Sequence, residues 1–491
     1  MPFVRFVMAL TVLSSLAWMF MFDGLARTES RFGMGAVKGE TSIGFIGSPD
    51  ALHASIDNNV NAGITALKPD GSWEPSKLVS SFTVDGKGLV WTAKLNDGLR
   101  WSDGTTITSD AIMRSLKATL ANGTYGARIS GNLKTIRVDD VSRSIIFELK
   151  KPMAVFPFLL ADPEYAIKPT DADLKAVSSG AYTITGSRSD GRDITLTANR
   201  YYRVNRKAGV IHMHAYDTDE EGLRALDAGR IAYLVKDSAI KGNVDAARYD
   251  VRRGNGTRRT MMLFNGRLDV SQPMFSDQHF RMGISKALDG NALMQALGDD
   301  GNISRTPVVP GSYGFKDNNA AYAYNPNEGR FLSTSYFGVK NNRLLWKASK
   351  GHAFGEVVDG NLNMILQYTR WEEVDDATYD RKMADRDYDM ALYDMTGLDG
   401  FKDMLNGNSL TSIDDQPMVD EAYDGIFAAA DSNALIAAID NAAVQSASAN
   451  MADWLYVHRT TVISSKGSHA MNPNLVDVDM MLPEAGGSES E

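Results

Sequence analysis

Alternating and helical hydrophobic patterns follow one another along this chain, and their succession restricts its fold more than any single motif does. Three β-hairpin patterns, each made of two β-rich runs around a polar turn, span residues 82–95, 135–152 and 179–202. Apolar residues recur at helical spacing in the tract from Met418 to Asn450. Because strands and helices mix throughout, the sequence predicts an α/β (mixed α+β) fold. The chain has 491 residues, which is enough for two or three domains.

Residues 99–116, which read LRWSDGTTITSDAIMRSL, raise the question of a catalytic or metal-binding loop. Asp103 and Gly104 suit a turn, since Asp bonds its own backbone and Gly accepts a positive φ. Thr108 is a good N-cap, and Asp110 suits the first turn of a helix. A calcium loop would need more oxygen ligands at closer spacing. We therefore interpret these polar residues as a strand–turn–helix connection.

Residues 1–26 have the layout of a secretory signal peptide. Arg5 precedes an uncharged apolar run over residues 6–22, and small residues such as Ala26 follow it. An uncleaved membrane anchor is the alternative, but the run is slightly short for a full span. We expect this segment to be removed and residues 27–40 to form a flexible lead-in. The remaining chain is then expected in the periplasm or another extracytoplasmic space.

The chain contains no cysteine and carries a formal net charge of −10. Thiolate metal sites, disulfides and a lipid-modified N-terminal cysteine are therefore excluded, so the protein is not expected to be a lipoprotein. The acidity argues against nucleic acid or an anionic membrane surface as a partner. An exported protein without disulfides must rely on its hydrophobic core, and this length supports one.

No catalytic or phosphate-binding motif stands out. The chain lacks a Gly-rich phosphate loop followed by Lys and Ser or Thr, an HExxH helix and a G-x-S-x-G elbow. His212 and His214 could supply half of a metal site, but a solvated strand face is the favoured interpretation. The acidic run 372–376 is favoured as a charged helix start, and the basic run 252–259 as a solvated strand rim. We predict no metal, no cofactor and no enzymatic activity.

Several motifs, taken in order, carry a resemblance to a known family. They read LVWTAKLNDGLRWSDGTTITSDAIMRSL, SSGAYTIT, ITLTANRYY, ALDAGRIAYLV, MMLFN, FSDQHFRMGISKALDGNALM, YAYNPNEGRFL and DYDMALYDMTGLDGF. The chain resembles the family 5 extracellular solute-binding proteins, which are the dipeptide, oligopeptide and nickel binders of ABC importers. The resemblance runs from about Thr41 to Asn474, and residues 99–116 are its most specific part.

The resemblance implies a two-lobed clamshell with an additional small inserted domain. The ligand would lie in the cleft between the lobes, and binding would favour the closed state. The expected boundaries are 41–68, 176–262 and 461–491 for a discontinuous lobe I, 69–175 for the small domain, and 263–460 for lobe II.

The resemblance also implies ligand-binding residues. In peptide-binding members, an Asp that follows the strand of this motif holds the α-amino group of the ligand. The matching stretch here reads YDMALYDMTGLDGF. Asp399 is the closest match, and Asp394, nearer the strand end, is its rival; a buried ammonium needs such a carboxylate. Three further contacts are implied: Trp371 as a pocket wall, Arg381 as the partner of a ligand carboxylate, and Tyr125 as a side chain that the small domain presents to the cleft. For each residue, ordinary packing or a surface position is the alternative.

By this resemblance the chain is the substrate-binding protein of an ABC importer. It would capture a small solute, expected to be a peptide, and deliver it to a transmembrane permease. We expect a monomer. An oligosaccharide, an opine-like conjugate or a metal chelate is an alternative ligand in the same fold. An exported hydrolase and a non-transport sensor are alternatives of a different class.

Overall fold

The computed structural model describes residues 39–472, apart from several internal segments. The segments outside the description are 48–55, 69–70, 124–125, 171–176, 203–207, 243, 267–271, 307, 309–312, 315, 317–322, 337–340, 396–416, 451 and 467–470. Residues 1–38 and 473–491 also lie outside it, so the predicted signal peptide and residues 27–38 of the predicted lead-in stay predictions. The lead-in is wrong at its end, because Glu40 already belongs to the first described strand.

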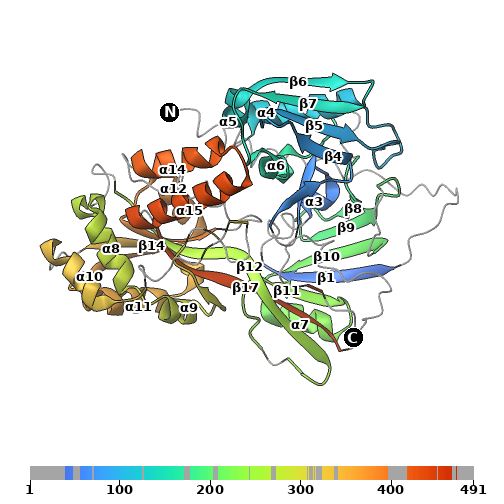
Figure 1. The fold of residues 1–491 in the computed structure, drawn as a ribbon. Helices are drawn as coiled ribbons and strands as arrows, with labels where there is room; N and C mark the ends of the chain where they lie inside the picture. Colours follow the sequence, from blue (N-terminus) through green and yellow to red (C-terminus); the bar gives the residue numbers. More distant parts are fainter. Residues whose placement is uncertain are drawn as a thin grey trace.

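In the described residues, eleven strands form one long mixed sheet (Figure 1). Its strands, in spatial order, are β15 (Thr369–Val374), β14 (Asn342–Lys347), β16 (Met390–Met395), β12 (Tyr249–Phe264), β17 (Ala452–Ser465), β11 (Tyr233–Lys236), β1 (Glu40–Ile46), β10 (Val210–Tyr216), β9 (Asp193–Ala198) and β8 (Tyr182–Ser187), while β13 (Gly301–Ile303) pairs with β17. Strands and helices are mixed, as the sequence predicts.

The long strands β12 and β17 connect the two halves of this sheet. They pair antiparallel over almost their whole length, with a register shift between Asn255 and Arg259. All but two of the β17 residues are buried, as expected for a strand with neighbours on both sides and packing on both faces. β11, β1, β10, β9 and β8 lie on one side of the pair, and β14 to β16 lie on the other. The two-lobed class is therefore confirmed.

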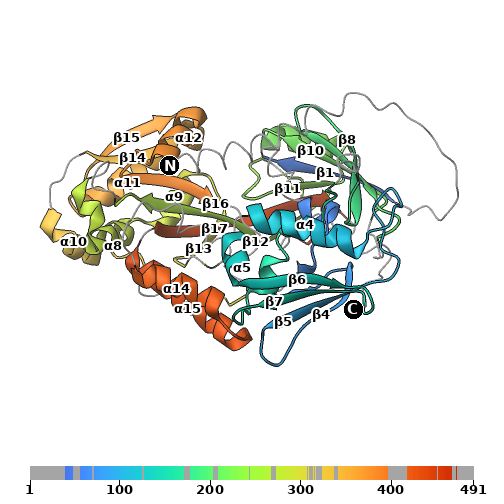
Figure 2. The same ribbon diagram turned by 90° about the horizontal axis from the view of Figure 1, so that it is seen from above.

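A separate four-stranded antiparallel sheet forms the core of the small domain (Figure 2). Its strand order is β4 (Val79–Val84), β5 (Val90–Leu95), β7 (Ser144–Leu149) and β6 (Leu133–Asp139), and α4 (Ser109–Asn122), α5 (Gly126–Asn132) and α6 (Phe156–Leu159) pack with it. The short β2 (Thr65–Leu67) and β3 (Trp73–Pro75) pair nearby, and α3 (Asp57–Val60) precedes them. The predicted hairpins are confirmed as β4–β5, β6–β7 and β8–β9.

The polar residues of 99–116 serve the connection into α4. Asp103 Oδ1 accepts from the backbone N–H of Thr105 at 2.8 Å, and Gly104 has a φ of 92°. Thr108 caps α4 by accepting from the backbone N–H of Ala111 at 3.1 Å. The predicted turn and N-cap are confirmed.

Helices cover both lobes. In lobe II, α8 (Gln278–Ala287), α9 (Gly290–Ala296) and α11 (Ala353–Asn363) enclose a core with the sheet, and α10 (Pro326–Leu332) packs on α8. α12 (Asp376–Asp385) places Tyr379 in a second lobe II core. In lobe I, α7 (Asp219–Asp227) packs beside β1 and β11.

Two helices near the C-terminus lie between lobe II and the small domain (Figures 1 and 2). These are α14 (Pro417–Ala428) and α15 (Ser432–Ala449), which confirms the predicted helical tract and places a break at Asp431, the N-cap of α15. Their apolar faces share one hydrophobic core with the small domain. At the other end of α15, Arg281 of α8 donates to Ala449 O at 2.6 Å and to Asn450 O at 3.0 Å. α15 therefore contacts both neighbours.

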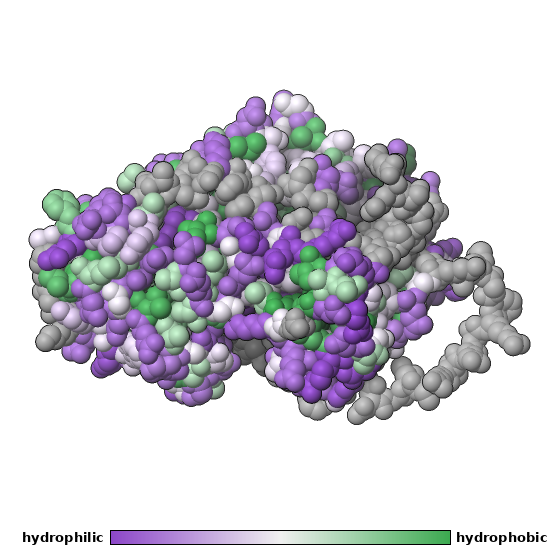
Figure 3. Space-filling model, turned by 90° about the horizontal axis from the view of Figure 1, so that it is seen from below, coloured by the Kyte–Doolittle hydropathy of each residue, from purple (hydrophilic) through white to green (hydrophobic). Residues whose placement is uncertain are grey.

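No helix in the part of the chain that the structure describes is long and apolar enough to cross a membrane. Figure 3 shows hydrophilic residues over most of the face seen from below, and the hydrophobic residues there form small separate groups. The large apolar side chains are mainly in the cores.

Candidate functional site

The carboxyl ends of parallel strands from both lobes point toward the middle of the β12–β17 pair, where the sheet passes from lobe I to lobe II. We call this region, around the register shift between Asn255 and Arg259, the crossing. In lobe I, β11 runs parallel to β1 and ends with Lys236 opposite Thr461 of β17. In lobe II, β16 runs parallel to β14 and ends with Met395 opposite Arg259 of β12. Ligands of open α/β sheets bind outside the carboxyl ends of the strands. The crossing is therefore the first place to look for a binding site.

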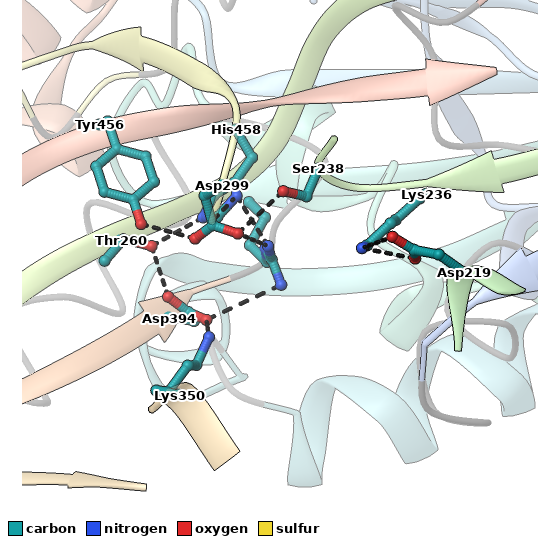
Figure 4. A network of polar contacts seen from close by, with 10 residues as sticks. Asp219, Lys236, Ser238, Thr260, Asp299, Lys350, Asp394, Tyr456 and His458 are labelled. Atoms are coloured by element: carbon teal, nitrogen blue, oxygen red, sulfur yellow. Dashed lines mark hydrogen bonds and ion pairs between the residues drawn. The ribbon is translucent and has the colours of Figure 1, made fainter. Parts of the chain in front are cut away.

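A set of polar side chains occupies this crossing, and we call it the crossing network (Figure 4). Its members are Ser238, Arg258, Thr260, Asp299, Lys350, Asp394, Tyr456 and His458. They come from β12, β16, β17, the residues after β11 and before β13, and the short 3-10 helix η6 (Ala348–Lys350) after β14. A separate ion pair, Lys236 with Asp219 at 2.8 Å, lies beside the network.

Asp394 is the centre of the lobe II side of the network. Its Oδ1 accepts from the Thr260 hydroxyl at 2.6 Å, and its Oδ2 accepts from Lys350 Nζ. Arg258 Nη1 lies 3.9 Å from the same Oδ2. Burial alone would raise the pKa of Asp394, but the charges of Lys350 and Arg258 outweigh burial and hold that pKa below its usual range. Asp394 is therefore ionised and already paired.

His458 is buried and neutral. Burial, helped by the charge of Arg258, lowers the pKa of His458 to about 3. Arg258 Nη2 lies 2.8 Å from His458 Nδ1, and a guanidinium can only donate, so Nδ1 must accept. The ring hydrogen is then assigned to Nε2, which donates to the Thr260 hydroxyl oxygen at 2.8 Å. The Thr260 hydrogen is left for Asp394, so these four side chains form one directed chain of hydrogen bonds.

Asp299 is the centre of the lobe I side. Ser238 donates to its Oδ1 at 2.9 Å, and Tyr456 donates to its Oδ2 at 2.7 Å. Arg258 Nη2 lies 3.6 Å from Oδ1. Burial and the adjacent Asp299 carboxylate raise the pKa of Tyr456, so its hydroxyl stays protonated. Arg258 thus stands between a carboxylate of each side.

The sequence-predicted site residues fall in different places. Asp394 is in the crossing network. Asp399 and Tyr125 lie outside the described residues, so their roles stay predictions. Trp371 lies on β15, where its indole N–H donates to Asp359 at 3.0 Å and its ring packs against Trp346 and His352.

Arg381 lies on the exposed side of α12, and its guanidinium is 3.4 Å from the Thr378 hydroxyl of the same helix. In the described residues, no hydrogen bond or ion pair joins Arg381 or Trp371 to the crossing network.

The interpretation of the basic run 252–259 as a solvated strand rim is wrong for its last two residues. Arg259 is 1% exposed, and its guanidinium lies 4.7 Å from the ring centre of Trp454. Arg258 belongs to the crossing network. The sequence did hold a signal, because both arginines lead directly into Thr260 and the buried run 261–264. Charged residues that continue into a buried strand are candidates for a site rather than a rim.

Two other polar features have local explanations. His212 Nε2 lies 2.5 Å from Glu40, and His214 pairs with Asp193, both on the outward face of the lobe I sheet. Asp375 caps α12 by accepting from the backbone N–H of Thr378 at 3.0 Å, so the charged helix start is confirmed for Asp375 and Asp376. It is wrong for Glu372 and Glu373, which lie on β15. Among the described residues, no group of three or more possible metal ligands is present.

The chain belongs to a family of binding proteins. The model of the bacterial extracellular solute-binding proteins, family 5, matches residues 75–412. A probable peptide ABC transporter periplasmic-binding protein of Sinorhizobium fredii is 22% identical in an alignment of 344 positions, gaps included, that covers 64% of this chain and 61% of that protein. The chain thus matches about three fifths of the length of this relative.

Solved structures share the fold at low sequence identity. DppA, a periplasmic binding protein of Helicobacter pylori in complex with the peptide STSA, has a TM-score of 0.72 and 15% identity, over 90% of this chain and 97% of that one. NikA of Brucella suis in complex with Fe(III)-EDTA has a TM-score of 0.74 and 14% identity, over 91% of this chain and 100% of that one. Both support the two-lobed binding-protein fold.

Proposed function

We propose that this chain is the substrate-binding protein of an ABC importer. It works in the periplasm after export, as a monomer without enzymatic activity, and binds a peptide between its lobes. It then delivers the peptide to a transmembrane permease. Membership of the solute-binding family and the peptide-transport name of its relative support the proposal.

The observation that carries the proposal is the junction between the lobes. β12 and β17 join two lobes whose parallel strands direct their carboxyl ends, and a set of charged side chains, toward the same crossing. Two bodies joined by a pair of strands can close on a ligand, and a ligand that contacts both favours the closed arrangement. Charged side chains at such a junction suit the capture of a polar or charged ligand.

Asp399 is our proposed partner for the α-amino group of the peptide, and Tyr125 is proposed to line the cleft from the small domain. For Trp371 and Arg381 we propose the family's roles of pocket wall and carboxylate partner. Alanine variants of these four residues test the assignments one by one. Asp380→Ala, which removes an exposed carboxylate of α12 whose side chain is 68% exposed, is the matched control.

Thermal shift of the purified protein tests the function. The panel holds di- to pentapeptides, free amino acids, oligosaccharides, opine-like conjugates and metal chelates, and any ligand that co-purifies is released and identified by mass spectrometry. A ligand that binds only the folded state raises Tm by mass action. We expect peptides to raise Tm and small-angle scattering to show a more compact protein with peptide bound.

Other results would change the proposed ligand class or the proposed function. Stabilisation by conjugates, sugars or chelates alone would keep the binding function and replace the ligand class. Turnover of a peptide or ester in the same panel would favour the hydrolase alternative. Binding and closure without transport in a strain that lacks the chain would favour a sensor.

A further inference from the structure

In the crossing network, every carboxylate oxygen accepts a hydrogen bond, whereas the two cations use only a few of their N–H groups. Both carboxylate oxygens of Asp394 and both of Asp299 accept a hydrogen bond from a network side chain. Arg258 donates one hydrogen bond, to His458, and Lys350 donates one, to Asp394, within the described residues. A guanidinium has five N–H groups and an ammonium has three. Most of the donor capacity of these two cations is therefore available.

The remaining contacts of Arg258 do not use that capacity. Its distances to Asp299 and Asp394, 3.6 Å and 3.9 Å, are ion-pair distances and too long for direct hydrogen bonds. Its Nε is buried and has no hydrogen-bond partner among the described residues. A buried donor without an acceptor is costly, and such groups in folded proteins call for an explanation. Nη1 likewise makes no hydrogen bond among the described residues, and it lies on the side of Asp394 and Lys350.

The two cations are also placed to act together. Lys350 Nζ and Arg258 Nη1 both approach the same oxygen, Asp394 Oδ2. Their side chains are 27% and 25% exposed, so each is held in place by its partners yet open on one side. One carboxylate beside Asp394 can accept from both, and a guanidinium matches the geometry of a carboxylate well.

We propose that Arg258 Nη1 and Lys350 Nζ bind a carboxylate of the transported solute, so that the cleft selects ligands with a free carboxylate. This rests on the proposed solute-binding function, and it gives the carboxylate a different partner from Arg381, which makes no contact with the crossing network among the described residues. Arg381→Ala should then keep the preference for the free acid. Asp394 holds the two cations in position and does not bind the ligand's amine. Both oxygens of Asp394 already accept hydrogen bonds, whereas Arg258 and Lys350 still have N–H groups that donate to no described residue. The role of Asp394 as an alternative partner of the ligand's amine is thereby replaced by that of a residue that positions Arg258 and Lys350.

Matched ligands test the proposal by isothermal titration. Each peptide that raises Tm is compared in three forms: free, C-terminal amide and N-acetylated. For an opine-like ligand or a chelate, the methyl ester replaces the amide. The proteins are the wild type, Arg258→Gln and Lys350→Gln. Arg253→Gln, on the same strand but outside the network, and Lys347→Gln, at the end of β14, are the controls.

We expect the wild type to bind the free acid at least about 10-fold more tightly than the amide, since hydrogen bonds to charged groups are among the strong ones. The preference falls below about 3-fold in Arg258→Gln and Lys350→Gln, because a neutral amide replaces a cation. Both controls keep the full preference. The Tm of each ligand-free variant checks folding. If Arg258→Gln does not fold, Lys350→Gln decides the result, because its side chain lies at the edge of the network.

Distinct results overturn the proposal. Equal affinity of the wild type for acid and amide, or a preference that survives in both variants, removes the carboxylate site while the transport function stands. Tight binding of neutral sugars alone does the same. If no member of any ligand class binds, the solute-binding function fails, and the carboxylate site fails with it.

Discussion

Lobe II meets the rest of the molecule at two junctions of different chemistry. At the crossing of β12 and β17, charged groups face each other, and Asp394 and Lys350 keep about a fifth and a quarter of their side-chain surface exposed. At the second junction, α14 and α15 share an apolar core with the small domain, where Ile426, Ile439 and Ala442 are fully buried. One junction is polar and partly open, and the other is apolar and closed.

The two junctions therefore contribute differently to stability and to ligand binding. Apolar burial is non-directional and supplies stability. Partly open charges contribute little net stability, but they impose geometry and can exchange an internal partner for a ligand. We therefore expect substitutions at the apolar junction to change stability most, and substitutions at the crossing to change ligand binding most.

The largest loss of stability is expected from Arg281→Met, because Arg281 of α8 holds the end of α15, the helix that carries part of the apolar junction. Arg281 is fully buried and donates to four carbonyl oxygens: Phe275 O (2.8 Å), Ser276 O (2.9 Å), Ala449 O (2.6 Å) and Asn450 O (3.0 Å). Burial lowers the pKa of Arg281 to about 10, so it remains charged at pH 7. Its removal leaves these carbonyls without a donor and should lower the free energy of unfolding by about 3–5 kcal/mol.

Urea denaturation measures this effect. Arg281→Lys is the informative companion, because a single ammonium keeps the charge but cannot reproduce the planar guanidinium. A loss under about 1 kcal/mol for Arg281→Met would show that α15 does not depend on this anchor.

Ile439→Ala comes next and tests the apolar junction itself. Ile439 is fully buried on α15 in the core shared with the small domain. Deleting a buried isoleucine leaves a cavity and should cost about 3 kcal/mol of unfolding free energy. Ala438→Gly, on the same helix but only half-buried, is a control for helix propensity, which is worth about 1 kcal/mol. Equal effects of the two substitutions would contradict a shared core.

Asp394→Asn should cost less at the crossing, about 1–3 kcal/mol of unfolding free energy at pH 7, because it leaves Lys350 and Arg258 without their carboxylate while solvent screens part of the charge. The same variant predicts a pH dependence. Because the folded-state pKa of Asp394 lies below its unfolded value, its stabilisation is present above about pH 4 and is lost as the pH falls further.

Unfolding free energies at pH 7, 5 and 3 check this prediction. The gap between the wild type and Asp394→Asn should be widest at pH 7 and should narrow at pH 3. A gap that grows on acidification would mean that Asp394 is protonated in the folded protein.

The smallest effect is expected at the exposed rim of the apolar junction. Arg128 pairs with Asp424 and lies 4.5 Å from the ring centre of Phe427, but the two charged side chains are 47% and 67% exposed. Arg128→Ala should therefore cost about 1 kcal/mol or less. The change in Tm should shrink further in 0.5 M salt, since exposed ion pairs are screened. A loss as large as that of Ile439→Ala would make the rim, rather than the core, the main contact.

Local features could be predicted from the sequence, and distant ones could not. The three hairpins and the Thr108 cap depend on neighbours within a few residues, where turn and capping chemistry decides. The helical tract from Met418 onward is of the same kind.

The crossing network depends on side chains far apart in the chain. Thr260 meets Asp394 across 134 positions and His458 across 198. No local pattern predicts such pairings, so Arg258 and Arg259 resembled a surface rim. The family resemblance supplied the two lobes, and it pointed to Asp394 through the strand end where that residue lies.

The late position of β17 in the chain has a consequence for the order of folding. β11 pairs with β17 and β12 pairs with β17, yet β11 ends at residue 236 and β17 begins at residue 452. Closing so long a loop is slow and entropically costly, so these pairings are expected late in folding. The crossing and both of its strands then assemble only after residues 452–465 are available. The long sheet, and with it the contacts of the crossing network, would therefore be complete only after the last tenth of the chain has joined it.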